Sequence, residues 1–342
     1  MILKSTGIIL LVISMICSAY ADTGTVEENK KSIENFDNRL TIRPYFQASL
    51  LKLNVKRYEK VPTNITEQEE ERYTDTITYE PNSLVNGGMR ISYLGFGFSF
   101  TRTLDQSARD KEVYGETEYS DYQIYYYGRK FGVEVFYQKY EGFYLDDSDT
   151  FSLKKGDPET IRSDLSVATG GFNIFYVFSD NFSFKAAFSQ LERQNAFDWS
   201  FLLMLSGIRF TINSDYSLIP ENQESLYGDD AGFTGGTFTA VGISPGIGIT
   251  KPFSNYCYIT AALFLGTGYM HKRYDVAIGE RVKHESFIKA NIKLGAGYNG
   301  TTWFFGFSFL ADESSSETIE SGKGVGVVAL VIVWEIFAGV RV

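Results

Sequence analysis

The sequence predicts an all-β protein, a transmembrane antiparallel up-and-down β-barrel of about 12 strands. Three observations lead to this fold class: apolar and polar residues alternate repeatedly along the chain, short connections alternate with long charged ones, and an export signal comes first. Successive side chains of a strand point to opposite faces. An apolar face opposite a polar or glycine face therefore indicates lipid on one side and polar packing on the other.

The alternation is clearest between Ile288 and Tyr298. Apolar residues occupy the even positions there, and lysine, asparagine and glycine occupy the odd ones. Rows of aromatic residues at 96–100, 182–188 and 303–309 repeat the pattern, mostly with small or polar residues between them. Each row is typical of a strand that faces lipid.

The first 21 residues have the layout of a secretory signal peptide. Lys4 precedes an apolar run, and a small-residue site predicts cleavage after Ala21. A lipoprotein would be processed at Cys17, but Ile16 is too large for the position before it. Cleavage leaves Cys257 as the single cysteine, which excludes an intramolecular disulfide.

Composition narrows the function classes. The formal net charge of -10 disfavours nucleic-acid binding, which needs a basic patch. After the signal, the chain has no run of about 20 apolar residues, so a membrane-spanning helix is not expected. The predicted organisation is a signal peptide over 1–21, a periplasmic lead-in over 22–37 and the barrel over 38–342.

The strands follow in order after the polar lead-in. The first changes phase near Leu51, which indicates a bulge. Almost no residues separate 84–94 from 95–103, or 165–178 from 181–190, whereas 57–78 and 144–163 are long charged loops. Tight periplasmic turns and longer outer loops are typical of bacterial outer-membrane barrels. The predicted strands span 40–56, 84–94, 95–103, 118–128, 131–143, 165–178, 181–190, 237–251, 256–271, 286–298, 301–312 and 325–342.

The segment 191–236 decides the strand number. With both termini in the periplasm the number must be even, and a further crossing at 197–213 would make it odd. We therefore expect 191–236 to form an outer excursion or a partial plug. The alternative is about 14 strands, with one strand not recognised.

Three short signatures resemble those of a bacterial outer-membrane family known as domain of unknown function 4421. They are Tyr79-Glu80-Pro81-Asn82 followed by Gly87-Gly88, then Gln190-Leu191-Glu192-Arg193-Gln194, and Asp215-Tyr216-Ser217-Leu218-Ile219-Pro220. The resemblance spans roughly residues 38 to 342. It implies an outer-membrane barrel and no assigned activity.

Charged and amide side chains on the inward positions are the first candidate site. They predict either a polar conduit or an interior closed by mutual ion pairs, because a barrel of this size lies between filled small barrels and open porins. Basic residues outnumber acidic ones among them, which favours anionic solutes weakly. The lumen-facing candidates are Arg43, Arg90, Glu134, Lys185, Lys289, Asn291, Lys293, Glu335 and Arg341.

A second candidate site is an inserted segment that narrows the lumen. Its polar groups would hold a gate or constriction, although an ordinary capped loop is the alternative. The constriction or plug candidates are Gln190, Glu192, Arg193, Gln194 and Asp215.

Enzymatic and metal chemistry are less well supported. His271 or His284 could act as the base of a Ser-His lipid hydrolase, but no characteristic serine spacing accompanies either residue. The acidic clusters at 146–149 and 229–230 lack the spacing of a calcium loop. We therefore expect no enzyme activity, no cofactor and no metal.

The sequence leaves two function hypotheses open. One is an outer-membrane barrel that passes or binds a small polar solute, in porin-like fashion; the other is an occluded structural or surface-interaction barrel that acts through its acidic outer loops. The expected location is the outer membrane of a Gram-negative-type envelope. The expected partners are outer-membrane lipid, lipopolysaccharide, the barrel-assembly machinery and the small polar solute.

Overall fold

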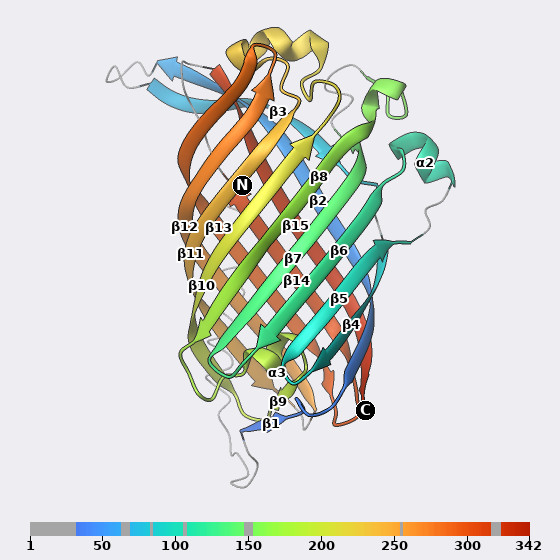
Figure 1. Cartoon of the computed structure of the whole chain (residues 1–342), viewed down its shortest axis with the longest axis vertical. Helices are drawn as coiled ribbons and strands as arrows, with labels where there is room; N and C mark the ends of the chain where they lie inside the picture. The colour runs from blue at the N-terminus through green and yellow to red at the C-terminus, as the bar shows by residue number, and fades with distance from the viewer. Residues whose placement is uncertain are drawn as a thin grey trace.

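The computed structural model describes residues 32–62, 69–82, 85–104, 108–146, 153–253, 256–315 and 323–342. Among these residues, twelve antiparallel strands close into a barrel (Figure 1). The predicted signal peptide at 1–21 lies outside the described residues. Round the wall the strands are β2 (Thr41–Pro62), β4 (Asn86–Tyr93), β5 (Phe96–Thr103), β6 (Glu118–Tyr127), β7 (Phe131–Leu145), β8 (Ile161–Val177), β10 (Asp198–Asn213), β11 (Gly235–Pro252), β12 (Cys257–Val276), β13 (Gly279–Asn299), β14 (Trp303–Ser315) and β15 (Lys323–Arg341).

The first and last wall strands close the sheet. β15 pairs with β2 from Lys323 opposite Glu59 down to Arg341 opposite Thr41. This pairing gives both strands a partner on each side, so the described wall has no open edge, as spanning a bilayer requires. We call the end that carries residues 32–40 and the C-terminus the base, at the bottom of Figure 1, and the opposite end the loop end.

The outer surface of the wall is apolar. Phe96, Phe98 and Phe100 are exposed on β5, while the alternate residues Ser99 and Thr101 are buried. On β14 the same alternation places Trp303 and Phe305 outward, and Phe304 and Ser308 in the bore. A closed barrel with apolar side chains outside and polar ones inside is a membrane-spanning barrel.

The strand predicted at 181–190 is wrong. These residues leave the wall, and residues 184–188 form the short helix α3 (Phe184–Phe188), capped by Ser183, whose hydroxyl accepts from the Ala186 amide. Phe182 and Phe184 are buried in the bore and do not face lipid. Phenylalanine side chains can be buried in an apolar interior as well as in lipid. The alternation at 182–188 therefore does not by itself indicate a lipid-facing strand.

The segment 191–236 was expected to form an outer excursion or a partial plug without a wall strand. This is wrong for residues 198–213, which form the wall strand β10. The strand number of 12 is confirmed and the alternative of 14 is wrong, because 198–213 takes the place of 181–190. Residues 33–35 of the predicted lead-in form β1 (Ile33–Asn35), which pairs with β9 (Glu192–Gln194). Figure 1 shows β1, β9 and α3 together at the base.

The remaining elements lie at the loop end. β3 (Glu69–Glu80) pairs with the outer half of β2, so most of the predicted loop 57–78 is a hairpin. α2 (Ala108–Tyr114) lies between β5 and β6. The short 3₁₀ helices are η2 (Pro158–Thr160), η3 (Glu221–Leu226) and η4 (Gly228–Asp230). No described helix is long and apolar enough to cross a membrane.

The wall changes its strand number at the first family signature. β3 and β4 follow one another along β2, and at the end of β3 Tyr79 and Glu80 pair directly with Leu145 and Tyr144 of β7. The short strands β5 and β6 therefore stop below this point. Within the described wall, twelve strands near the base become ten near the loop end.

Asn82 stabilises this junction. Its side-chain amide donates to the Gly115 carbonyl at 2.8 Å, and its backbone amide donates to the Thr117 hydroxyl at 2.7 Å. Thr117 in turn donates to the carbonyl of Gly142, where β7 carries a bulge. Gly142 has a φ of 85°, and a Cβ there would lie 2.0 Å from the Glu116 carbonyl, so the bulge requires glycine.

We expect Asn82→Ala to destabilise the barrel by about 1–3 kcal/mol, the usual cost of leaving a buried hydrogen-bonding group without its partner. The measurement is the thermal midpoint of the purified protein in detergent. Asn213→Ala, at an exposed position at the end of β10, is the matched control and should change stability by less than about 0.5 kcal/mol. Equal effects of the two substitutions would contradict the role given to Asn82.

Candidate functional site

A polar chamber occupies the middle of the bore. Its volume is about 210 Å³, and side chains from strands all round the wall line it. Charged, amide and tyrosine groups face one another across it. The polar lining residues are Arg43, Tyr45, Gln47, Arg90, Asp121, Gln123, Tyr125, Tyr127, Glu134, Gln138, Thr169, Asn173, Asn291, Lys293, Ser308, Asp312 and Glu335.

Three neighbouring strands place two arginines and one glutamate on the same wall. Arg43 on β2 forms a buried ion pair with Glu335 on β15, and Arg90 on β4 lies 3.9 Å from the other oxygen of the same carboxylate. Arg43 also donates to Oε1 of Gln190 at 2.6 Å. The arginine pair is therefore connected to the segment that closes the base.

One ion pair crosses the lumen. Nζ of Lys293 on β13 lies 3.0 Å from Oε1 of Glu134 on β7. Four strands of the described wall separate β7 from β13 on one side and six on the other, so the two side chains come from nearly opposite walls. Glu134 also accepts from the Tyr127 hydroxyl at 2.5 Å and from the Asn173 amide at 3.3 Å. This contact narrows the bore at the level of the chamber.

Two further predicted residues pair along the wall. Lys289 on β13 lies 3.4 Å from the Asp312 carboxylate on β14, and Asn291 donates to the same carboxylate at 2.7 Å. Asp121, from β6, also faces the chamber and accepts from Gln123 and Gln138. Asp121 and Asp312 were not among the predicted lumen residues, although both occupy inward positions of alternating strands.

The charges of this region balance. The four basic groups Arg43, Arg90, Lys289 and Lys293 are matched by four acidic ones, Glu134, Glu335, Asp121 and Asp312. The excess of basic residues in the sequence pattern therefore does not persist in the structure. The prediction of a weak preference for anionic solutes depended on that excess of basic residues, so the chamber gives it no support.

Several buried polar atoms of the chamber have no hydrogen-bond partner among the described residues. They include donors as well as acceptors. Since an unpaired buried polar atom costs free energy, such atoms indicate bound water or a polar ligand. The atoms are Nε of Arg43, Nε of Arg90, Oδ1 of Asp121, Oδ1 of Asn173 and Oδ1 of Asn291.

The second family signature closes the base. We call residues 178–197, together with 32–37, the base plug. Glu192 is the centre of its polar contacts: it pairs with Lys185 at 3.2 Å and with Arg129 of the wall at 3.4 Å, and it accepts from Ser183. Lys185 was predicted on a strand but lies on α3, where it also pairs with Asp37.

The other predicted plug residues make contacts both with the wall and within the plug. Gln190 donates to the Tyr258 hydroxyl at 2.9 Å, and Arg193 donates to the Asn299 carbonyl at 3.2 Å and pairs with Glu34 of the plug. Gln194 accepts from the Ser183 amide at 2.9 Å. Arg341, buried at the base end of β15, donates to carbonyls of Gln190 and Gly300. The predicted residues 190, 192, 193 and 194 therefore share one site.

Asp215 does not belong to that site. It lies at the opposite end of the bore, exposed in the connection between β10 and β11. The prediction grouped it with Gln190 because no crossing strand was assigned between them. β10 separates the second and third signatures by the length of the barrel.

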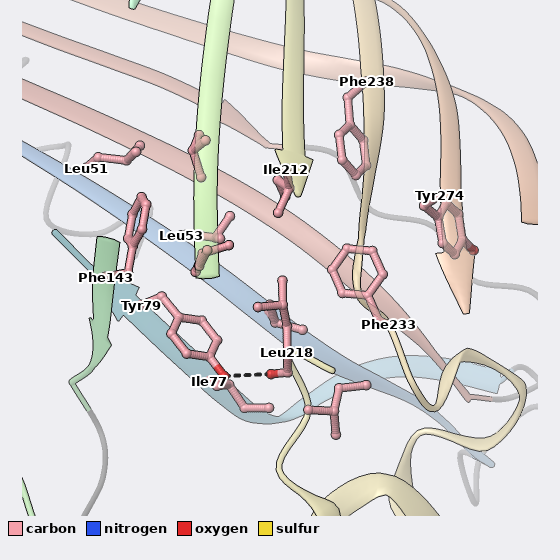
Figure 2. Close-up of a cluster of buried hydrophobic side chains, with 14 of the residues drawn as sticks. Leu51, Leu53, Ile77, Tyr79, Phe143, Ile212, Leu218, Phe233, Phe238 and Tyr274 are labelled. Carbon is pink, nitrogen blue, oxygen red and sulfur yellow. Dashed lines mark hydrogen bonds between the residues drawn. The ribbon is translucent and has the colours of Figure 1, made fainter. Parts of the chain in front are cut away.

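The third signature closes the loop end. We call residues 214–234 the loop plug. Leu218 and Ile219 are buried among side chains from several wall strands, and the Tyr79 hydroxyl donates to the Leu218 carbonyl at 2.9 Å (Figure 2). Phe233 of the same plug lies beside Tyr274 of β12, with ring centroids 6.0 Å apart. An apolar cluster therefore fills the bore above the chamber.

Arg162 attaches the loop plug to the wall. Its guanidinium donates to the carbonyls of Ser217 at 2.9 Å and Tyr216 at 3.0 Å, and to the carboxylate of Asp164. Burial alone would raise the pKa of Asp164, but hydrogen bonds from Arg162 and Ser214 and the arginine charge outweigh it. The pKa of Asp164 is therefore below its usual range, which keeps the carboxylate ionised.

The two histidines lie outside the bore. His271 and His284 lie opposite each other on the outer face of the wall, on β12 and β13. Among the described residues, no group of three or more histidine, cysteine or acidic side chains could hold a metal ion. Asp147 and Asp149 lie outside the described residues, and Asp146 pairs with Lys155 at 3.2 Å.

These features define a class of protein: a membrane-spanning twelve-stranded barrel with a polar chamber between two plugs. The family model described as domain of unknown function (DUF4421) matches residues 30–324, and the chain belongs to this family. The three signatures build the junction of the wall, the base plug and the loop plug. No curated protein matches the chain.

Solved structures resemble the chain only distantly. The outer membrane protease OmpT from Escherichia coli has 8% identity and a TM-score of 0.40, with 92% of this chain and 99% of that chain covered. The Pseudomonas putida toluene transporter TodX has 8% identity and a TM-score of 0.27, with 89% and 90% covered. A Pseudomonas aeruginosa FadL homologue has 10% identity and a TM-score of 0.26, with 89% and 90% covered.

We expect Arg162→Ala to loosen the loop plug, because it removes the donors to Ser217 and Tyr216. Cleavage by a glutamate-specific protease after the exposed Glu221 should become faster. The exposed Arg273, at the same end of the barrel, supplies the control Arg273→Ala. Unchanged cleavage in Arg162→Ala would show that the apolar cluster alone holds the plug.

The lowered pKa of Asp164 predicts a defined pH dependence. Its stabilising contribution is complete above the pKa of an unfolded aspartate, about 3.9, and is lost as pH falls through the lower folded value. The difference in thermal midpoint between wild type and Asp164→Asn should therefore be constant from pH 7 to about pH 4 and shrink only below it. A difference that had already vanished at pH 5 would contradict this assignment.

Proposed function

We propose that the protein is an outer-membrane barrel that binds a small polar solute in the mid-barrel chamber and passes it when the base plug moves. The base would face the periplasm and the loop end the outside. The observation that carries the proposal is the set of unpartnered donors and acceptors round one cavity. An apolar interior would fill this space at lower cost if closure were the only requirement.

The chemistry of the chamber suggests the class of solute. Balanced charges and a mixture of free donors and acceptors suit a zwitterionic or neutral polar molecule better than an anion. A volume of about 210 Å³ corresponds to roughly seven water molecules at about 30 Å³ each. The solute would therefore be about as large as an amino acid.

The base plug is the better candidate for the moving part. Ion pairs and hydrogen bonds connect it to the wall, notably Glu192 with Arg129 and Gln190 with Arg43. Both plugs also bury apolar side chains in the bore, Leu218, Ile219 and Phe233 in the loop plug and Phe182, Phe184 and Leu191 in the base plug. Polar contacts can exchange with water or with a polar solute as a plug moves. The base plug is also the one that lines the chamber, through Phe188, so a bound solute would lie against it.

A second function is favoured by a different observation. Both ends of the bore are filled, and the pair of Lys293 and Glu134 crosses it. These contacts suit an occluded structural or surface-interaction barrel that acts through its outer loops. A lipid hydrolase has less support, because the described side-chain contacts of His271 are with His284, which in turn stacks on Tyr269.

Conductance of the purified protein in planar bilayers separates the two functions. We expect wild type to give rare stepwise openings and Glu192→Gln to open far more often. The substitution leaves the buried Lys185 without part of its compensating charge, and breaking such a pair typically costs about 3–5 kcal/mol in the docked state. The matched control is Glu221→Gln, at an exposed position of the loop plug.

The absence of stepwise current from both wild type and Glu192→Gln, across a range of salts and voltages, would overturn the solute pathway and leave the occluded barrel. Glu192→Gln must first be shown to be folded by the heat-dependent change in its electrophoretic mobility. Openings that are equally frequent in wild type and Glu192→Gln would place the moving part elsewhere.

A further inference from the structure

The two histidines of the chain form one cluster on the outer wall. The sequence contains two histidines in 342 residues, and they lie directly opposite each other on adjacent strands. Nδ1 of His271 and Nδ1 of His284 are 3.3 Å apart, and their ring centroids are 4.6 Å apart. The two rings are in contact, with an angle of 43° between their planes.

The distance between the nitrogens matches that of two ligands on one metal ion. Zn²⁺ binds histidine nitrogen at about 2.0–2.1 Å with tetrahedral geometry, which separates two ligand nitrogens by about 3.3–3.4 Å. Two ligand nitrogens that meet a metal ion at a right angle, as in square-planar or octahedral coordination, would be about 2.9 Å apart with bonds of similar length. The observed 3.3 Å therefore fits two ligands of a tetrahedral ion better than two ligands at a right angle.

The surroundings hold the pair in place and leave it accessible. His284 is exposed, and its ring stacks on Tyr269 with an angle of 19° between the planes. On the same outer face, Arg273 and Glu280 lie just beyond the histidines and form a pair at 3.6 Å. Lys272 and Glu285 point inward and pair with each other. On the outer face the neighbouring charges are thus balanced. Lys283, next to His284 in the sequence, lies over the ring of Tyr274, which is buried on the inner face.

The site lies on the outer face of the wall, toward the loop end. Tyr269, two residues before His271, is an exposed aromatic residue, the type that is enriched at membrane interfaces. With Tyr269 taken as the level of the interface, the histidines lie about 7 Å farther toward the loop end, at about 3.3 Å per residue, among lipid headgroups and water. Water can therefore reach the remaining coordination positions.

We propose that His271 and His284 form a surface site for a tetrahedral divalent ion of the zinc class. The two Nδ1 atoms supply two ligands, and water or another oxygen ligand fills the other two positions. Imidazole is a preferred ligand for such ions. The inference is independent of the chamber and of any solute that passes it.

The test is Zn²⁺ binding by the full chain in detergent, purified without a polyhistidine tag. We expect one Zn²⁺ per chain. His271→Ala and His284→Ala should each weaken binding by at least about tenfold, since the loss of an outer-shell partner alone costs about tenfold to a hundredfold. Glu280→Gln, a neighbouring change that spares the imidazoles, is the matched control and should bind as wild type does.

A second measurement needs no substitution. Co²⁺ bound to the wild-type protein should give the intense visible absorption of tetrahedral coordination, and Zn²⁺ should displace it. Binding that persists in the doubly substituted His271→Ala/His284→Ala protein, or the absence of binding by a folded wild type, would overturn the proposal. A weak octahedral Co²⁺ spectrum would also overturn it.

Discussion

Backbone hydrogen bonding in lipid is the constraint on which the rest of this structure depends. Inside a bilayer every strand needs a partner on both sides, and the pairing of β15 with β2 supplies the last of them. Closure with twelve strands creates a bore too wide for single side chains to fill from the wall alone. Two segments that leave the wall, 178–197 and 214–234, fill what remains at the two ends.

Lipid outside and packing inside impose different rules on the same chain. The outer face needs only apolar area, so any large hydrophobic residue satisfies it. The interior has to pair each charge, which Glu335 does for Arg43 and Asp312 does for Lys289. In the chamber the charges balance, but several buried donors and acceptors have no hydrogen-bond partner among the described residues. A barrel that only had to be closed would not need such atoms.

The sequence predicts the parts of the fold that lipid controls. The rows at 96–100 and 303–309 could be recognised because a lipid-facing strand must alternate, and inward residues such as Glu134 and Lys293 followed from the same period. The row at 182–188 alternates in the same way but does not face lipid. Its phenylalanines pack inside the bore, where apolar side chains are also buried. The alternation of residues along one strand does not show the order of the strands in the wall. The position of Asp215, the pair of Glu134 and Lys293, and the contact of the two histidines all depend on that order.

The contact between Glu134 and Lys293 has a consequence for the order of folding. The two residues are 159 positions apart in sequence and come from nearly opposite walls. No single hairpin can bring them together, because the whole run of strands from β7 to β13 must first curl to about half of the barrel. The contact therefore forms late in folding. An interaction absent from the transition state acts mainly on the unfolding rate. This ion pair would thus lengthen the lifetime of a finished barrel while leaving its rate of assembly almost unchanged.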